Sequence, residues 1–182
     1  MASKTSITEL RNYLRSLDKE SLESEVEKLF QKYKSVREYY EVKLYMDDKP
    51  AKNESVILKK YKAKIMNAIH PDYDWQGGFN TEAVEKAIKR FNELELSLDA
   101  YVELNLFAIQ EATTIANLYG GDYGEEFYIY FQELFEHLLL KLYREGGLEK
   151  YKHEMWDIIS NAFEGYGHYD TLKETYDDYY KD

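Results

Sequence analysis

The sequence of 182 residues contains no cysteine, which excludes disulfide bonds, cysteine-based zinc sites, iron–sulfur clusters and thiol nucleophiles. It has only two prolines and nine glycines, so collagen-like and low-complexity chains are excluded as well. No stretch reaches the roughly 18 uncharged apolar residues that cross a membrane, and the N-terminus lacks the apolar segment of a secretion signal. We therefore expect a cytoplasmic protein with no membrane partner.

Positive charge is also scarce in one part of the chain. The net charge is −11, yet residues 1–70 carry 15 Lys and Arg against 11 Asp and Glu, whereas residues 71–182 carry 9 against 24. Residues 91–140 contain no Lys or Arg and ten carboxylates. This excess of negative charge repels nucleic acid, so we expect no nucleic-acid partner. A simpler interpretation is that the charge only keeps the protein soluble.

Apolar residues recur every three or four positions along most of the chain, a period typical of α-helices. The pattern predicts an all-α fold of about eight helices, packed as antiparallel hairpins in one compact domain over residues 1–182. The segment HPDYDWQGGFN, residues 70–80, combines proline, paired glycine and a change in charge balance. It predicts a boundary between two lobes at residues 70–80.

Residues able to cap helices mark several predicted helix starts. Asp18 precedes a long helix over residues 18–44, Thr81 precedes a fourth helix, and Asp170 precedes the last one. Each of these side chains can accept hydrogen bonds from free backbone N–H groups. The segment 98–119 is apolar around most of a helical circumference, which predicts that neighbouring helices cover nearly all of it.

No phosphate-binding loop, nucleophile elbow or dinucleotide fingerprint occurs in the sequence. Glu133 and His137 lie one helical turn apart and are weak candidates for metal ligands. Neither this pair nor the series Glu149, His153 and Asp157 matches a known metal-binding motif. The simpler interpretation places these histidines on the surface, and we predict no cofactor.

Tyrosine is unusually abundant, with 19 residues in total and 11 of them from Tyr119 onward. A tyrosine ring offers a large apolar area and a polar tip at little entropic cost, which suits a surface that contacts another protein. The tyrosines near the C-terminus therefore either dock the last helix onto the core or face a partner.

The C-terminal half contains the stretches LYGGDYGEEFYIYFQELFEHLLL and GYGHYDTLKETYDDYY, and the N-terminal part reads LRNYLRSLDKESLESEVEKLFQKYKSVREYY. In these segments the chain resembles an uncharacterised bacterial family, the domain of unknown function numbered 6155, over nearly its whole length. The resemblance implies the helical fold and no activity, since the family has none assigned. The loop at residues 70–80 departs from the basic, proline-containing loop of the family. The recurring family positions are Asp122, Tyr123, Phe127, His168, Asp170, Leu172 and Tyr179.

Two functions are consistent with these features. The preferred one is a non-catalytic interaction module whose acidic, tyrosine-rich C-terminal half binds a protein with a basic surface or a second copy of the chain. Its candidate surface residues are Asp122, Tyr123, Glu125, Glu126, His168, Asp170 and Tyr179. The alternative is a metal-dependent or small-ligand-binding enzyme, which requires that its side chains converge on one point. The residues of that alternative are Glu133, His137, His168 and Asp170.

Overall fold

The computed structural model describes residues 6–46, 50–70 and 79–180, without the side chains of residues 45–46 and 50–53. These ranges contain nine α-helices, two short 3-10 helices and no β-strand, so the predicted all-α fold is confirmed. The chain divides into two compact units, Met1–Pro50 and Ala51–Asp182, and each is described by itself. The boundary predicted at residues 70–80 falls largely on 71–78, outside the described ranges, and stays a prediction.

The first unit contains three helices, α1 (Ile7–Ser16), α2 (Lys19–Lys32) and α3 (Lys34–Met46). Side chains cap the first two. Ser6 and Glu9 form a reciprocal capping box on α1, and the carboxylate of Asp18 accepts from the backbone N–H of Ser21 at 2.8 Å. The predicted cap at Asp18 is therefore confirmed.

The long helix predicted over residues 18–44 is wrong, because the chain leaves the helical conformation at Tyr33 (φ −116°, ψ 120°). The break lets α2 and α3 pack on each other, with the rings of Phe30 and Tyr40 6.4 Å apart. Arg37 also donates to the carbonyl of Gln31 at 3.1 Å, an oxygen that the end of α2 leaves without a helical partner. Packing of the two apolar faces thus overrides the continuous helical pattern.

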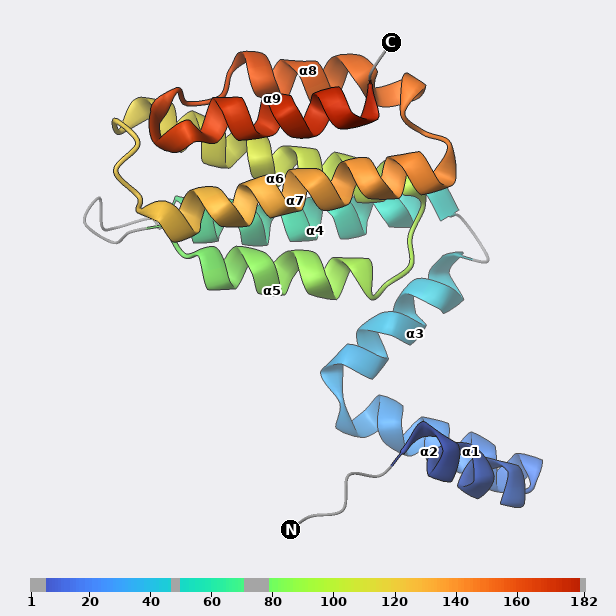
Figure 1. The fold of residues 1–182 in the computed structure, drawn as a ribbon. Helices are drawn as coiled ribbons and strands as arrows, with labels where there is room; N and C mark the ends of the chain where they lie inside the picture. Colours follow the sequence, from blue (N-terminus) through green and yellow to red (C-terminus); the bar gives the residue numbers. More distant parts are fainter. Residues whose placement is uncertain (1–5, 47–49, 71–78, 181–182) are drawn as a thin grey trace. The chain divides into compact units, whose positions relative to one another are not determined.

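The second unit stacks its six α-helices in three layers of two (Figure 1). The outer layers are α4 (Pro50–Ile69) with α5 (Thr81–Asn92), and α8 (Lys152–Ser160) with α9 (His168–Tyr179). The middle layer is α6 (Leu98–Leu118) with α7 (Glu125–Glu145). Consecutive helices run in opposite directions, as the prediction of antiparallel hairpins requires (Figure 1). The 3-10 helices η1 (Glu149–Tyr151) and η2 (Gly165–Gly167) precede α8 and α9.

Helix α6 forms the centre of this unit, and neighbours cover most of its circumference as predicted. Val102, Leu104, Ala108 and Ile109 are completely shielded from solvent. The facing helix α7 adds Phe135 and further leucines that are equally inaccessible. Burial of this much apolar surface is the main favourable contribution to folding. No helix in the described ranges is long and apolar enough to cross a membrane.

Two predicted caps differ from the structure. The residue before α5 is Asn80, whose side chain accepts from the N–H of Ala83 at 3.0 Å, and Thr81 is the first helical residue. Helix α9 begins at His168 after the left-handed Gly167, so Asp170 lies inside the first turn. There its negative charge still complements the positive end of the helix dipole.

Candidate functional site

The start of α7 and the turn before α9 lie at the same end of the second unit (Figure 1). Four exposed carboxylates lie on the α6–α7 loop, the first turn of α7 and the first turn of α9. Two exposed tyrosines, Tyr119 at the end of α6 and Tyr166 in η2, are 64% and 60% accessible. We call this region the acidic end. It consists of Tyr119, Asp122, Glu125, Glu126, Tyr166 and Asp170.

The ring of Tyr166 joins the two segments of the acidic end. It stacks on Tyr128 of α7 with centroids 5.1 Å apart, and its hydroxyl donates to Asp122 at 3.4 Å. Tyr166 adopts a left-handed conformation (φ 56°), which is unfavourable for a residue with a side chain. The surrounding contacts hold the residue in this conformation, with its ring exposed beside the carboxylates.

The loop that carries Asp122 is fixed by close packing around Gly121. The hydroxyl of Tyr128 donates to the carbonyl of Gly121 at 2.6 Å. Gly121 has φ +73°, and a Cβ atom there would lie 2.3 Å from the ring of Phe163. Only glycine satisfies both the backbone conformation and the available space.

His168 lies beneath the acidic end, not on its surface. It is 3% exposed, its ring is 5.1 Å from that of Tyr128, and its Nδ1 is 3.3 Å from the amide nitrogen of Gln132. Burial lowers the pKa of His168 to about 4, because the charged imidazolium is poorly solvated there. The amide nitrogen of Gln132 can only donate, so Nδ1 of His168 is the acceptor in this contact.

The carboxylates of residues 91–140 differ in whether they are neutralised. Asp99 pairs with Lys150 at 2.6 Å, Glu103 with Lys62 at 2.7 Å, and Glu111 approaches His70 at 3.4 Å. These three lie along α6. The carboxylates of the acidic end, by contrast, form no ion pair with any residue in the described part of the chain.

The remaining tyrosines of the predicted surface mostly serve packing. Tyr123 is half-buried and stacks on Phe127 at 5.0 Å. Tyr179 contacts Tyr143 edge-on at 6.1 Å, and it lies eleven residues along α9 from His168, a separation of about 16 Å. Tyr179 is therefore not part of the acidic end.

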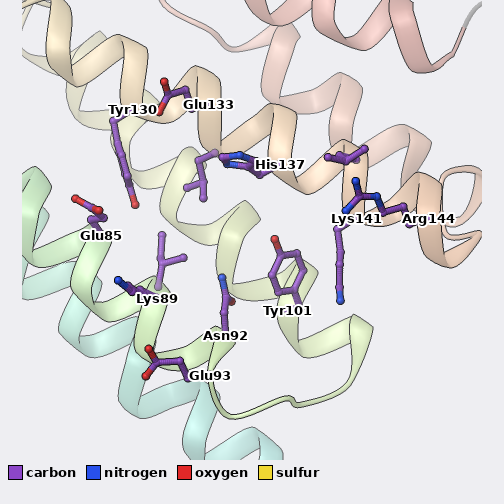
Figure 2. Close-up of a pocket in the computed structure, with 13 residues that line it drawn as sticks. Glu85, Lys89, Asn92, Glu93, Tyr101, Tyr130, Glu133, His137, Lys141 and Arg144 are labelled. Carbon is purple, nitrogen blue, oxygen red and sulfur yellow. The ribbon is translucent and has the colours of Figure 1, made fainter. Parts of the chain in front are cut away.

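A second feature of this unit is a cavity of about 820 Å³ between α5 and α7, with Tyr101 of α6 also lining it (Figure 2). We call it the α5–α7 groove. Helices α5 and α7 both pack against α6. The apolar part of the lining is Ile88, Leu134 and Leu140, and the polar part is Glu85, Lys89, Asn92, Glu93, Tyr101, Tyr130, Glu133, His137, Lys141 and Arg144.

Charges of opposite sign occupy the two ends of the groove (Figure 2). Glu85 and Glu133 flank Tyr130 at one end, whereas Lys141 and Arg144 lie at the other. Burial raises the pKa of Tyr130, and the nearby carboxylate of Glu85 acts in the same direction, so this phenol stays protonated at neutral pH.

Several polar groups in the groove have no partner within the described residues. The hydroxyls of Tyr101 and Tyr130 and the imidazole of His137 form no hydrogen bond there. Arg144 and Glu133 form no salt bridge there either, whereas Lys141 pairs with Glu145. Such groups are available to a bound molecule.

The metal candidates of the sequence do not converge. His137 is exposed on α7 and lines the groove, whereas His168 is buried beneath the acidic end. Within the described ranges, no three side chains of His, Asp or Glu are placed to hold one metal ion. Glu133 and His137 line the groove together with residues of α5. The spacing of residues along α7 could not predict this contribution from another helix.

Comparison with known proteins places the chain in a family. A family model described as a family of unknown function, DUF6155, matches residues 5–178. The chain belongs to this family. The match covers both units and confirms the resemblance seen in the sequence, and the DUF6155 description assigns no activity. Neither the curated proteins nor the solved structures contain a match to the chain.

Proposed function

We propose that this member of the DUF6155 family is a non-catalytic interaction module that binds a protein with a basic surface through its acidic end. The observation that carries the proposal is the combination, at one end of the second unit, of exposed aromatic rings and carboxylates that form no ion pair with any described residue. Asp122 and Glu125 supply charge, and Tyr119 and Tyr166 supply contact area. Charge of one sign accelerates encounter with an oppositely charged partner, and tyrosine is enriched among the residues that dominate interface energies.

The way the acidic end is built also supports the proposal. Tyr166 is held in an unfavourable backbone conformation with its ring outward, and Gly121 is confined by Phe163. A region with fixed side chains loses little conformational entropy when it binds. The ring of Tyr128 stacks on that of Tyr166, so Tyr128 is a positioning residue that orients the exposed ring.

Charge reversal at the acidic end tests the proposal. The tagged full-length protein and its Glu125→Lys/Glu126→Lys variant are used to capture proteins from a lysate of the source cells. A recovered basic protein is then purified and its association rate measured. We expect the double variant to associate at least about tenfold more slowly at low salt, because it loses electrostatic attraction.

A matched control separates local charge from net charge. Glu149→Lys/Glu154→Lys changes the net charge equally, at exposed carboxylates of η1 and α8. This variant is expected to retain most of the wild-type rate. Equal slowing by both double variants would show that only net charge matters, and it would contradict a defined binding region. Equal rates for all three proteins would exclude the acidic end as the binding region.

A further inference from the structure

The α5–α7 groove is long enough for a short extended peptide. Helix α7 rises about 1.5 Å per residue, so the groove runs about 21 Å from Tyr130 to Arg144. An extended chain advances about 3.3 Å per residue, so about six residues fit along this length.

The charges along α7 define a direction in the groove, whereas on the α5 side Lys89 and Glu93 follow Glu85 at intervals of about one helical turn. The carboxylates of Glu85 and Glu133 lie at one end, and the guanidinium of Arg144 lies at the other (Figure 2). Glu133 and Arg144 are separated by about 16 Å along α7. A ligand that satisfies both ends carries a cation and an anion at about this distance. Between them an apolar part can contact Ile88 and Leu134, and the charges of Lys89 and Glu93 on the α5 side offset each other.

We infer that the α5–α7 groove binds a short apolar peptide with free termini. At about 3.3 Å per residue, five extended residues span the distance between the two charged ends. The α-amino group lies toward Glu85 and Glu133, and the terminal carboxylate lies toward Arg144. The hydroxyls of Tyr101 and Tyr130 and the imidazole of His137 are available to the peptide backbone in between. This inference does not rest on the acidic end.

The experiment uses the full-length protein and the peptide Ala-Leu-Ala-Leu-Ala in four forms: with free termini, N-acetylated, C-amidated, and blocked at both ends. Isothermal titration calorimetry measures the dissociation constant of each. We expect acetylation or amidation to weaken binding about fivefold, the upper range for a partly exposed charge pair. Peptides of three or eight residues are expected to bind less tightly than the five-residue peptide.

Two variants assign the orientation. In Arg144→Gln, amidation is expected to have no further effect, while acetylation still weakens binding. In Glu133→Gln, the pattern is expected to reverse. Both side chains are exposed, so these changes leave the core intact. The matched controls are Arg90→Gln on α5 and Glu136→Gln on α7, which are exposed and do not line the groove.

Each possible result decides the inference. The inference is supported if blocking either peptide terminus weakens binding to the wild-type protein and to the two control variants. Each groove variant must also lose the sensitivity to one terminus only. Equal affinity for all four peptide forms would overturn it, as would the absence of binding at millimolar peptide. If the groove variants lose peptide binding but still bind a basic protein normally, the groove and the acidic end are separate sites. Glu125→Lys/Glu126→Lys is expected to retain the dependence on both peptide termini.

Discussion

The two units of this chain use their apolar residues in different ways. In α1–α3, Ile7 is 69% exposed, Leu10 is 49% exposed and Leu44 is 67% exposed, and neither α1 nor α2 contains a buried residue. In the second unit, α6 alone contains eleven buried residues. Because stability follows apolar burial, the second unit carries most of the folding free energy.

The charge differs between the units as well. Residues 1–50 carry ten Lys and Arg and ten Asp and Glu, whereas residues 51–182 carry 14 against 25. The entire net charge of −11 therefore belongs to the unit with the packed core. A well-packed scaffold tolerates the repulsion among unpaired surface carboxylates, which explains how the acidic end can be maintained.

The largest expected effect comes from the core of the second unit. Phe135→Ala removes a fully buried ring on α7 and leaves a cavity, so we expect a loss of about 3 to 5 kcal/mol in unfolding free energy. Both tryptophans, Trp75 and Trp156, belong to residues 51–182, so urea unfolding followed by their fluorescence reports on this unit. A loss below about 1 kcal/mol would contradict the assignment of most of the folding free energy to the core of the second unit.

Acid should destabilise the second unit through His168. With a folded pKa of about 4 against an ordinary value of 6.5, the unfolded state binds a proton first as the pH falls. Stability is therefore lost between about pH 6.5 and pH 4, by up to about 3 kcal/mol. Urea midpoints across this range, compared with those of His168→Gln, isolate the contribution of the histidine from that of the carboxylates. An identical slope in both proteins would contradict the assigned burial.

A smaller effect is expected at Gly121. Gly121→Ala introduces a Cβ atom against Phe163 at a left-handed position, and we expect a loss of about 1 to 3 kcal/mol. Gly120→Ala is the matched control, because Gly120 has nearly the same φ of +76° and nothing within 4 Å of the added atom. A similar loss in both variants would mean that backbone conformation alone explains the effect, and that packing against Phe163 contributes nothing.

The smallest effect is expected in the first unit. Leu10→Ala removes a side chain that is already half exposed, so we expect a change below about 0.5 kcal/mol in the unfolding of the second unit. Tryptophan fluorescence measures this change, because residues 1–50 contain no tryptophan. A loss of about 2 kcal/mol or more would show that the units are energetically coupled, and that the second unit depends on the first for its stability.

The sequence predicted the helices and the buried position of residues 98–119 better than it predicted the contacts between helices. The period of the apolar residues was sufficient to predict a buried α6, and Asp18 marked the start of α2. The break at Tyr33 was missed, since it lies between lysines with no proline or glycine to signal it. It accompanies packing between α2 and α3, through pairs such as Phe30 and Tyr40 that meet only after the chain has turned.

At the candidate sites, too, contacts between helices could not be predicted from the sequence. His168 stood among glycine, tyrosine and aspartate, a composition typical of an exposed turn, yet contacts with Tyr128 and Gln132 of α7 bury it. Glu133 and His137 were recognised by their spacing, which relates residues on one helix only. The opposite wall of their groove comes from α5, and no feature of α7 specifies it.

The salt dependence of association is the decisive test of binding through the acidic end. The association rate of the full-length protein with a recovered basic partner is measured from about 20 to 500 mM salt, beside that of Glu125→Lys/Glu126→Lys. We expect the wild-type rate to fall steeply with salt and the rates of the two proteins to converge at high salt, because screening removes the attraction that distinguishes them. A wild-type rate that stays constant over this range would contradict it.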